Sequence, residues 1–197
     1  QESMSKSKKN TIDPETMIKQ YGADSVRWFI LSDSPPEKDV QWSDIGVASA
    51  NKFLQKVWNL NYLTSLREEK KINKKKENEF ISKIHNYIYK IDTSINNFRL
   101  NVSIAHFYEV YKILKDYLEN EISNSTYKDC LTKIMKLMIP FTPHLAHECL
   151  EFLNFNDFDE WPKIDRENIL DEILIAVQVN GKTKDVINIK KDMDEKS

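Results

Sequence analysis

Residues 77–98 read ENEFISKIHNYIYKIDTSINNF, and this stretch decides the fold class. Its apolar side chains recur at intervals of three and four residues: Phe80, Ile84, Tyr87, Ile88, Ile91, Ile95 and Phe98. That spacing places them on one face of an α-helix and leaves the polar residues on the other face. The stretch therefore predicts a long amphipathic helix, which must bury its apolar face against neighbouring elements.

The flanking sequence supplies those neighbours. Further helices are predicted over residues 14–21, 25–32, 44–69, 102–118, 125–139 and 144–153. Ser43 and Asn101 precede two long ones as expected N-caps, because their side-chain oxygens can accept bonds from first-turn N–H groups. Asp13 and Asp24 are expected to cap the first two helices, and Gly22 to end the first. Long helices with one apolar face and short connections predict an antiparallel bundle.

Composition and the C-terminal sequence complete the predicted fold. The 197 residues include only 3 glycines and 6 prolines, whereas turns and all-β folds use both heavily. Near the end, two segments rich in β-branched residues flank Asn180-Gly181, a strong hairpin signal. We predict a mainly α fold with an antiparallel helix bundle over 43–165. Residues 170–197 are predicted to form a short β-hairpin that begins a further domain.

Charge, cysteines and hydropathy narrow the class of protein. The 29 basic and 31 acidic residues give a net charge of −2, so only local patches can favour nucleic acid. Cys130 and Cys149 fall on apolar helix faces without a CxxC, and we expect reduced core thiols. No apolar run approaches the roughly 18 residues of a membrane span. We expect a soluble, cytoplasmic, monomeric protein. Because the chain starts without Met, we also expect it to be part of something longer.

Common catalytic and metal-binding motifs are absent from the sequence. His144 and His147 stand three residues apart with Glu148 beside them, but zinc proteases require HExxH or HxxEH. We therefore expect no metal site. GxGxxG, GxxxxGK[ST] and GxSxG are also missing. The chain alone contains no complete catalytic constellation.

The opening segment, Met4-Ser5-Lys6-Ser7-Lys8-Lys9-Asn10, carries a different kind of chemistry. Three ammonium groups lie within four positions, and two serine hydroxyls alternate with them. Positioned cations and small donors of this kind can neutralise a polyphosphate whose charge grows as a bond breaks. A frayed basic terminus is the alternative interpretation.

The continuation of this segment carries a family resemblance. The opening loop, Asp13-Pro14 and residues 21–27 (YGADSVR) together resemble the KMSKS loop and the helices after it in class I aminoacyl-tRNA synthetases. Further motifs resemble the leucyl-tRNA synthetases in particular. These are residues 35–44 (PPEKDVQWSD), 52–58 (KFLQKVW), 140–148 (PFTPHLAHE), 161–162 (WP) and 177–182 (VQVNGK). The resemblance covers essentially the whole chain, in order.

This resemblance implies a division of roles. Residues 1–42 would be the KMSKS-type loop and stem-contact helices at the end of the catalytic region, 43–165 the anticodon-binding bundle, and 170–197 the start of the C-terminal domain. Lys6 would be catalytic, and Ser5, Lys6, Ser7 and Lys8 would line the phosphates of ATP, which is used with Mg²⁺. Position 3 is Ser where the family has its first motif lysine. The family's HxGH sequence is absent, so the fragment is not expected to aminoacylate alone.

The remaining expected partner is tRNA(Leu). The resemblance implies that the bundle docks along the tRNA by backbone and shape contacts. Lys52, Lys56 and Arg99 are the candidate phosphate contacts, each with an ordinary solvated helix charge as its alternative. The lysine run at residues 70–76 is expected to be a solvated loop, and the aromatic residues at helical periods are expected to be core. A fragment of an isoleucyl, valyl or methionyl enzyme stays an alternative, as does a helical protein-interaction module.

Overall fold

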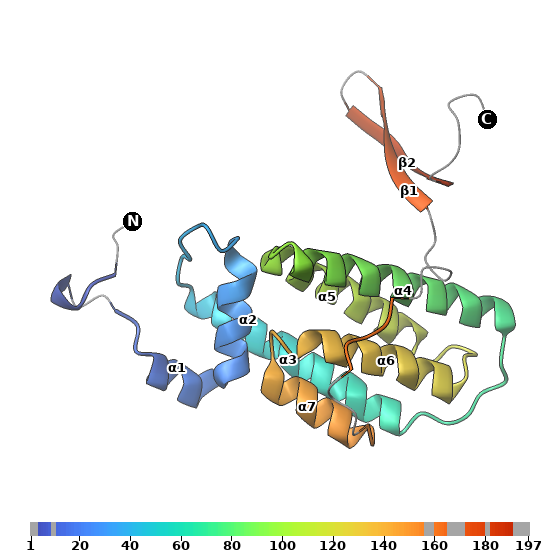
Figure 1. Cartoon of the computed structure of the whole chain (residues 1–197), viewed down its shortest axis with the longest axis horizontal. Coiled ribbons are helices and arrows are strands. Elements are labelled where there is room, and N and C mark those ends of the chain that lie inside the picture. The colour runs from blue at the N-terminus through green and yellow to red at the C-terminus, as the bar shows by residue number, and fades with distance from the viewer. Residues whose placement is uncertain (1–3, 9–10, 156–159, 165–171, 180–181, 191–197) are drawn as a thin grey trace.

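A computed structural model describes residues 4–8, 11–155, 160–164, 172–179 and 182–190 (Figure 1). Over these residues it contains one 3-10 turn, seven α-helices and two strands. The bounds are η1 (Lys6–Lys8), α1 (Pro14–Tyr21), α2 (Ala23–Asp33), α3 (Asp44–Ser65), α4 (Lys74–Asn96), α5 (Leu100–Tyr117), α6 (Asn124–Met138), α7 (Pro143–Phe152), β1 (Glu172–Val179) and β2 (Lys182–Lys190). The predicted mainly α fold is confirmed.

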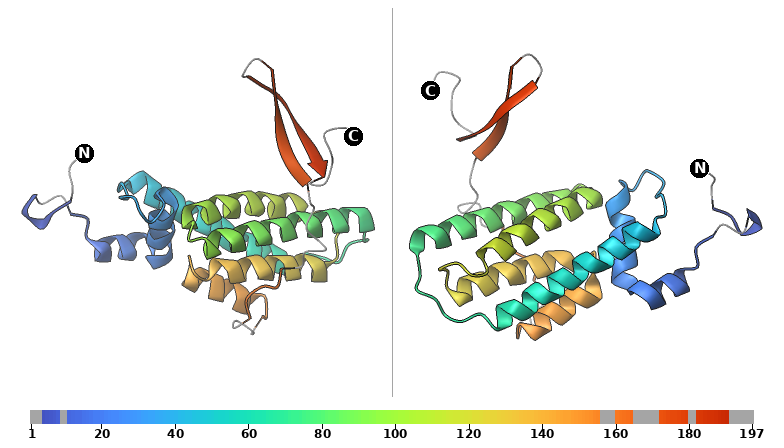
Figure 2. Two further views of the ribbon diagram at one scale, coloured as in Figure 1. Left: turned by 45° about the horizontal axis from the view of Figure 1, so that its top comes forward. Right: turned by 180° about the vertical axis from the view of Figure 1, so that it is seen from behind.

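Helices α3 to α7 form the bundle, and each runs opposite to the helix before it (Figures 1 and 2). α2 crosses one end of this bundle, and α1 extends away from it. β1 and β2 pair antiparallel, with Glu172 opposite Lys190 and Val179 opposite Lys182. The predicted pairing is confirmed, while the Asn180-Gly181 turn lies outside the described residues. No helix in the described part of the chain is long and apolar enough to cross a membrane.

An aromatic cluster fills the core where α2 meets the bundle. Trp28 is fully buried, and its ring centroid lies 5.3 Å from that of Phe53 and 5.7 Å from that of Phe107. The indole Nε1–H donates to the hydroxyl of Tyr108 at 3.1 Å, so its polar atom is satisfied. Because α2 contributes the largest buried side chain of this cluster, it packs as part of the same core as the bundle helices.

Two glycines permit the geometry around α2. Gly22 has a φ of 83° between α1 and α2, a region that side chains with a Cβ rarely adopt, and it ends α1 as predicted. Gly46 lies in the first turn of α3, where an added Cβ would stand 2.4 Å from Cε2 of Phe29. Its lack of a side chain therefore lets α2 and α3 approach closely.

Asp24 is not the cap of its own helix, contrary to the sequence prediction. α2 already begins at Ala23, and the Asp24 carboxylate turns to the start of α7 instead. It accepts a 2.7 Å bond from the backbone N–H of Leu145 and lies 2.9 Å from Nδ1 of His144. Thr142, the N-cap of α7, makes no side-chain capping bond. Asp24 therefore satisfies a first-turn N–H of α7 that would otherwise lack a partner.

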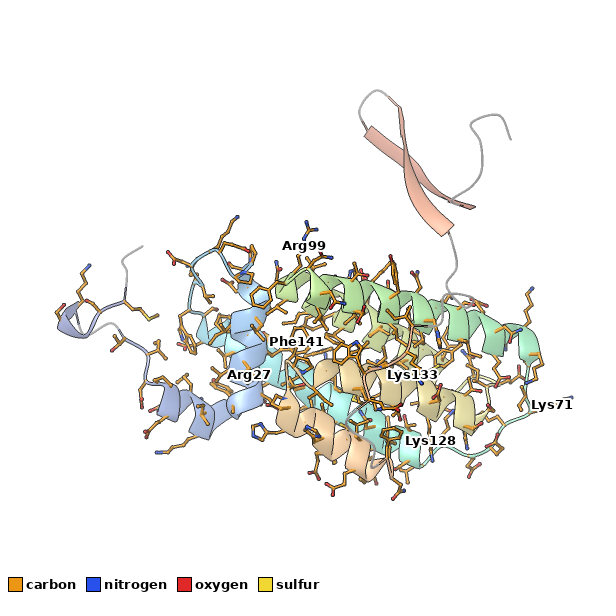
Figure 3. The ribbon with its side chains drawn as sticks, viewed as in Figure 1. Arg27, Lys71, Arg99, Lys128, Lys133 and Phe141 are labelled. Atoms are coloured by element: carbon orange, nitrogen blue, oxygen red, sulfur yellow. The ribbon has the colours of Figure 1, made fainter. Side chains whose placement is uncertain are left out.

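Arg27 strengthens the same junction one turn later in α2. Its guanidinium donates from Nη2 to the carbonyl of Pro140 at 2.8 Å and from Nε to that of Phe141 at 3.3 Å. Figure 3 shows Arg27 and Phe141 together at this end of the bundle. α2 thus binds the first turn of α7 through the Asp24 carboxylate and the segment just before α7 through the Arg27 guanidinium.

Several predicted helix ends differ from the structure. α3 ends at Ser65 rather than near residue 69, because Arg67 turns to bond the backbone carbonyls of Leu118, Asn120 and Ile122. α5 begins at Leu100, with Arg99 rather than Asn101 at its cap position. α4 ends at Asn96, so Phe98 lies beyond the helix and is 62% exposed rather than part of the apolar stripe.

Glu77 is a buried carboxylate that caps a neighbouring helix. It lies in the first turn of α4, and its Oε1 accepts bonds from the backbone N–H and the hydroxyl of Ser123, the N-cap of α6. Its Oε2 lies 2.8 Å from Nζ of Lys74. The hydrogen bond from Lys74, followed by those from Ser123, lowers the pKa of Glu77 to about 2.

Replacing Glu77 with Gln should reduce the free energy of unfolding by about 2 kcal/mol at pH 7, because a charge-assisted capping interaction is lost. The folded-state pKa is lower than the ordinary value of 4.5. This contribution is therefore present above pH 4.5 and is lost as pH falls toward 2. Urea denaturation of both proteins between pH 7 and pH 2 should show the difference shrinking. Glu79→Gln, at an exposed ion pair of the same helix, is the control; a pH-independent difference for Glu77→Gln would contradict the assignment.

Replacing Asp24 with Ala should reduce the free energy of unfolding by about 1–2 kcal/mol, because α7 loses its cap. Asp24→Asn should cost less, since an amide oxygen can still accept the bond from Leu145. Urea denaturation at neutral pH measures both changes, with Asp39→Ala at an exposed position as the control. Equal stability of Asp24→Ala and the unaltered chain would show that Asp24 does not cap α7.

Candidate nucleic-acid interface

The opening loop brings its two serine hydroxyls together. The Oγ atoms of Ser5 and Ser7 lie 3.2 Å apart, and the backbone N–H of Lys8 donates to the carbonyl of Ser5 at 3.1 Å. Ser7 and Lys8 are exposed and Ser5 is half-buried. Lys6 lies within the 3-10 turn η1, but its side chain is outside the described part of the structure. The loop therefore presents hydroxyl and ammonium donors on a tight turn.

Lys52 and Lys56 lie one turn apart on α3 and line a groove between α3 and α5. The groove has a volume of about 360 Å³, and its other lining residues are Ser49, Phe53, Tyr108 and Tyr111. Both lysines are exposed, and neither has an ion-pair partner within 4.0 Å among the described residues. Their charge is therefore available to an anionic partner, and the tyrosines give the groove an aromatic wall.

Arg99 does not join the two lysines in this groove. It stands at the N-terminal end of α5, nine positions before Tyr108, which corresponds to about 13 Å along the helix axis. Its side chain is exposed and points away from the bundle in Figure 3. The three residues predicted to contact phosphates therefore lie at two separate places on the surface, with Lys52 and Lys56 in the groove and Arg99 at the start of α5.

The lysine run at residues 70–76 is largely neutralised within the molecule. Lys70 lies 2.5 Å from Glu119, Lys76 lies 3.0 Å from Glu121, and Lys74 pairs with the buried Glu77. The hydrogen bonds from Lys70 and Lys76 lower the pKa of the two exposed glutamates. The last three residues of the run also begin α4, so the run is partly helix rather than wholly loop. Its ion pairs hold the α3–α4 connection and the start of α4 against the α5–α6 connection.

Sequence reasoning missed the exposure of several aromatic residues, Tyr108 and Phe98 among them. Trp28 is buried as predicted, but Tyr108 is 42% exposed and Phe98 is 62% exposed. For Phe98 a signal was present, because Asn96-Asn97 just before it is a typical helix ending. Tyr108 carried no such signal, since its exposure depends on how α3 and α5 pack.

His144 and the two cysteines belong to the packed fold. His144 lies against Asp24 at the α2–α7 junction, and no group of three His, Cys, Asp or Glu side chains among the described residues could hold a metal ion. Cys130 and Cys149 are buried thiols, as predicted, and burial raises the pKa of each to about 12. Neither thiol has the thiolate character that reactivity requires.

Two protein families match this chain in sequence. Residues 77–197 match the family described as the anticodon-binding domain of tRNA ligase. Residues 2–43, which include the opening loop, match the class I tRNA synthetases of the I, L, M and V group. The two family matches cover the N-terminal and C-terminal parts of the chain, and both agree with the resemblance to the synthetases.

Curated relatives are leucine–tRNA ligases. The protein of Hyphomonas neptunium is 38% identical over 200 residues, covering 98% of this chain and 23% of the relative. That of Fervidobacterium nodosum is 38% identical over 206 residues, covering 98% of this chain and 25% of the relative. The chain therefore spans about a quarter of the length of these relatives.

A solved structure shares the fold. It is a crystal structure of the ternary complex of Agrobacterium radiobacter K84 agnB2 LeuRS with tRNA and LeuAMS, with a TM-score of 0.78 and 23% identity. The similarity covers 98% of this chain and 26% of that one. From the family match, which takes in more than half of its residues, the chain belongs to the family of the tRNA-ligase anticodon-binding domain, and its resemblance to the leucine enzymes is confirmed.

Proposed function

We propose that this chain is the tRNA-binding part of an ATP-dependent leucine–tRNA ligase. The observation that carries the proposal is the 35–38% identity to leucine–tRNA ligases over 98% of the chain. The parent enzyme would activate leucine with ATP and transfer it to tRNA(Leu) in the cytoplasm, with one copy of the protein per functional unit. The consistent leucine specificity of these relatives favours this enzyme over the isoleucyl, valyl and methionyl alternatives.

The α3–α5 groove is the proposed place of tRNA contact. Lys52 and Lys56 have no ion-pair partner among the described residues, whereas the 70–76 run is paired to Glu119, Glu77 and Glu121. A polyanion gains most where positive charge is not already neutralised, so the groove is the better site for phosphates. Arg99 would add a contact at the N-terminal end of α5. Since lysines and arginines contact phosphates without reading sequence, tRNA choice by base identity would lie elsewhere.

The opening loop would face ATP in the parent enzyme. Its residues fit phosphates, because Ser7 and Lys8 are exposed donors and residues 4–8 include no carboxylate. ATP, with Mg²⁺, would supply the energy of leucine activation. Lys6 would stabilise the charge that grows on the phosphates, while Ser5, Ser7 and Lys8 would hold them in place. The tight turn would hold Ser5, Ser7 and Lys8 in place before ATP arrives.

The α2–α7 junction would link the opening loop to the helix bundle that carries the groove. α1 and α2 carry the loop, and Asp24 and Arg27 fix α2 to the first turn of α7 and to the segment just before it. Binding energy gained on the bundle could then hold the tRNA in a defined relation to the loop. Correct positioning of reactants lowers a barrier even when the positioning residues are far from the reacting atoms.

Replacing Lys52 and Lys56 together with Gln should weaken binding of leucine tRNA by roughly tenfold and reduce its salt dependence. The slope of log affinity against log salt should fall in magnitude by about 2, one for each lost phosphate contact. Fluorescence anisotropy with labelled tRNA at several salt concentrations measures both quantities. Lys71→Gln with Lys128→Gln removes the same charge from two other exposed positions and should change binding less. Salt-insensitive binding of the tRNA would contradict phosphate contacts at this groove.

Replacing Lys6 with Ala in the full-length enzyme should slow leucine activation by about 10²–10³-fold, as expected for loss of one charge-stabilising group. Leucine-dependent exchange of pyrophosphate into ATP measures this step. Lys19→Ala, at an exposed ion pair on α1, is the control, and tRNA affinity should be unchanged in both variants. A normal exchange rate for Lys6→Ala would contradict the role given to this lysine.

A further inference from the structure

Phe98 occupies a backbone position that normally belongs to glycine. It follows the C-cap residue Asn97 of α4 and has a φ of 55°. Its N–H donates to the carbonyl of Ile95 at 2.9 Å, and the N–H of Arg99 donates to that of Ser94 at 2.8 Å. This bond pair is the Schellman motif, whose left-handed residue is usually glycine because a Cβ strains that conformation.

Among the described residues, the phenyl ring gains little packing to offset this strain. Phe98 is 62% exposed, and it lies outside both the buried core and the half-buried side chains packed against it. The Schellman motif is often accompanied by an apolar contact between the residue after the left-handed position and a residue in the last turn of the helix. Here the residue after Phe98 is Arg99, and its counterparts in the last turn are Ser94 and Thr93. All three are polar, so the apolar contact is missing. A bulky residue that is strained and exposed indicates a contact made outside the chain.

The surroundings of Phe98 favour an anionic aromatic partner. Arg99 follows directly, is exposed, and has no ion-pair partner among the described residues. No Asp or Glu occurs between residues 93 and 108, so this stretch of sequence carries positive charge without a carboxylate. Figure 3 shows Arg99 at the edge of the bundle, directed away from it.

We infer that the Phe98–Arg99 corner binds an unpaired nucleotide of RNA. The phenyl ring stacks on the base, and the guanidinium pairs with an adjacent phosphate, which together are the two contacts of single-strand recognition. The inference rests on the proposed RNA-binding function and adds a base contact to it. It also explains why a strained ring stands where glycine would relieve the backbone.

The test uses three variants of the whole chain. Phe98→Gly removes the ring and relieves the backbone strain. The melting temperature of this variant should therefore rise by about 2–4 °C, the shift expected when strain at one residue is relieved in a chain of about 200 residues. Phe98→Leu keeps an apolar side chain on the strained backbone but has no aromatic face. Phe98→Tyr keeps the aromatic ring. The melting temperatures of the last two should stay close to that of the unaltered chain.

Binding is measured with two RNA probes of equal charge at low salt. One is a labelled oligoadenylate of twelve nucleotides, and the other is a twelve-unit abasic strand that has the same phosphates but no bases. The unaltered chain and Phe98→Tyr should bind the oligoadenylate about 5- to 100-fold more tightly, the range that base–aromatic stacking supplies. Phe98→Gly and Phe98→Leu should lose that preference, although the first is the more stable protein.

The other outcomes separate this inference from the proposed function. If Phe98→Leu and Phe98→Gly keep the preference for bases, or if the unaltered chain has none, the corner does not stack bases. Salt-dependent, lysine-dependent binding of leucine tRNA in those cases would leave the proposed function standing. A lower melting temperature for Phe98→Gly would show that the ring stabilises the fold, which would also overturn the inference.

Discussion

The Asp24 carboxylate and the Trp28 indole hold α2 against the bundle, and the placement of the opening loop depends on them. One side chain caps a helix that begins far along the chain, and the other fills the core between α3 and α5. Arg27 adds bonds to two carbonyls of the same segment. Because these three residues share one helix, a shift of α7 or of the aromatic core would act on α2 and on α1, which packs against it.

The positive charge that an anionic partner can reach depends on which lysines are paired with carboxylates, and not on the net charge of the chain. The chain has a net charge of −2. Three lysines of the run at residues 70–76 form ion pairs with Glu119, Glu77 and Glu121. The positive groups that stay available are more scattered, as at Lys52 and Lys56. A polyanion would therefore meet a mostly balanced surface with a few favourable positions. Such a surface suits positioning of a large RNA better than indiscriminate attraction to any nucleic acid.

Local sequence predicted what depends on local physics. The 3-4 spacing of α4, the Asp13-Pro14 helix start and the Asn180-Gly181 hairpin signal each rest on a few neighbouring residues, and the helices and strands they predict are present. Capping by Asp24 could not be read this way, because its partner Leu145 lies 121 positions away. The hydrogen bond from Ser123 to Glu77 could not be predicted from local sequence either, because 46 positions separate the two residues. These contacts exist only once the helices have packed.

The candidate site was predictable to a similar degree. Lys52 and Lys56 were identified from the family motif at residues 52–58, but the tyrosines beside them depend on the packing of α3 and α5. Phe98 fitted the apolar period of its helix and was assigned to the core for that reason. The helix ends two residues earlier, which turns the ring outward. Periodicity predicts a face well, but it cannot say where the helix that carries the face stops.

The central claim is that the α3–α5 groove receives the RNA backbone, and lysine footprinting tests it most directly. The chain would be acetylated with and without leucine tRNA at low salt, and each lysine's modification measured by mass spectrometry. The account predicts that tRNA protects Lys52 and Lys56 while Lys71 and Lys128 react as before, and that high salt removes the protection. Equal reactivity of Lys52 and Lys56 with and without bound tRNA would contradict the account.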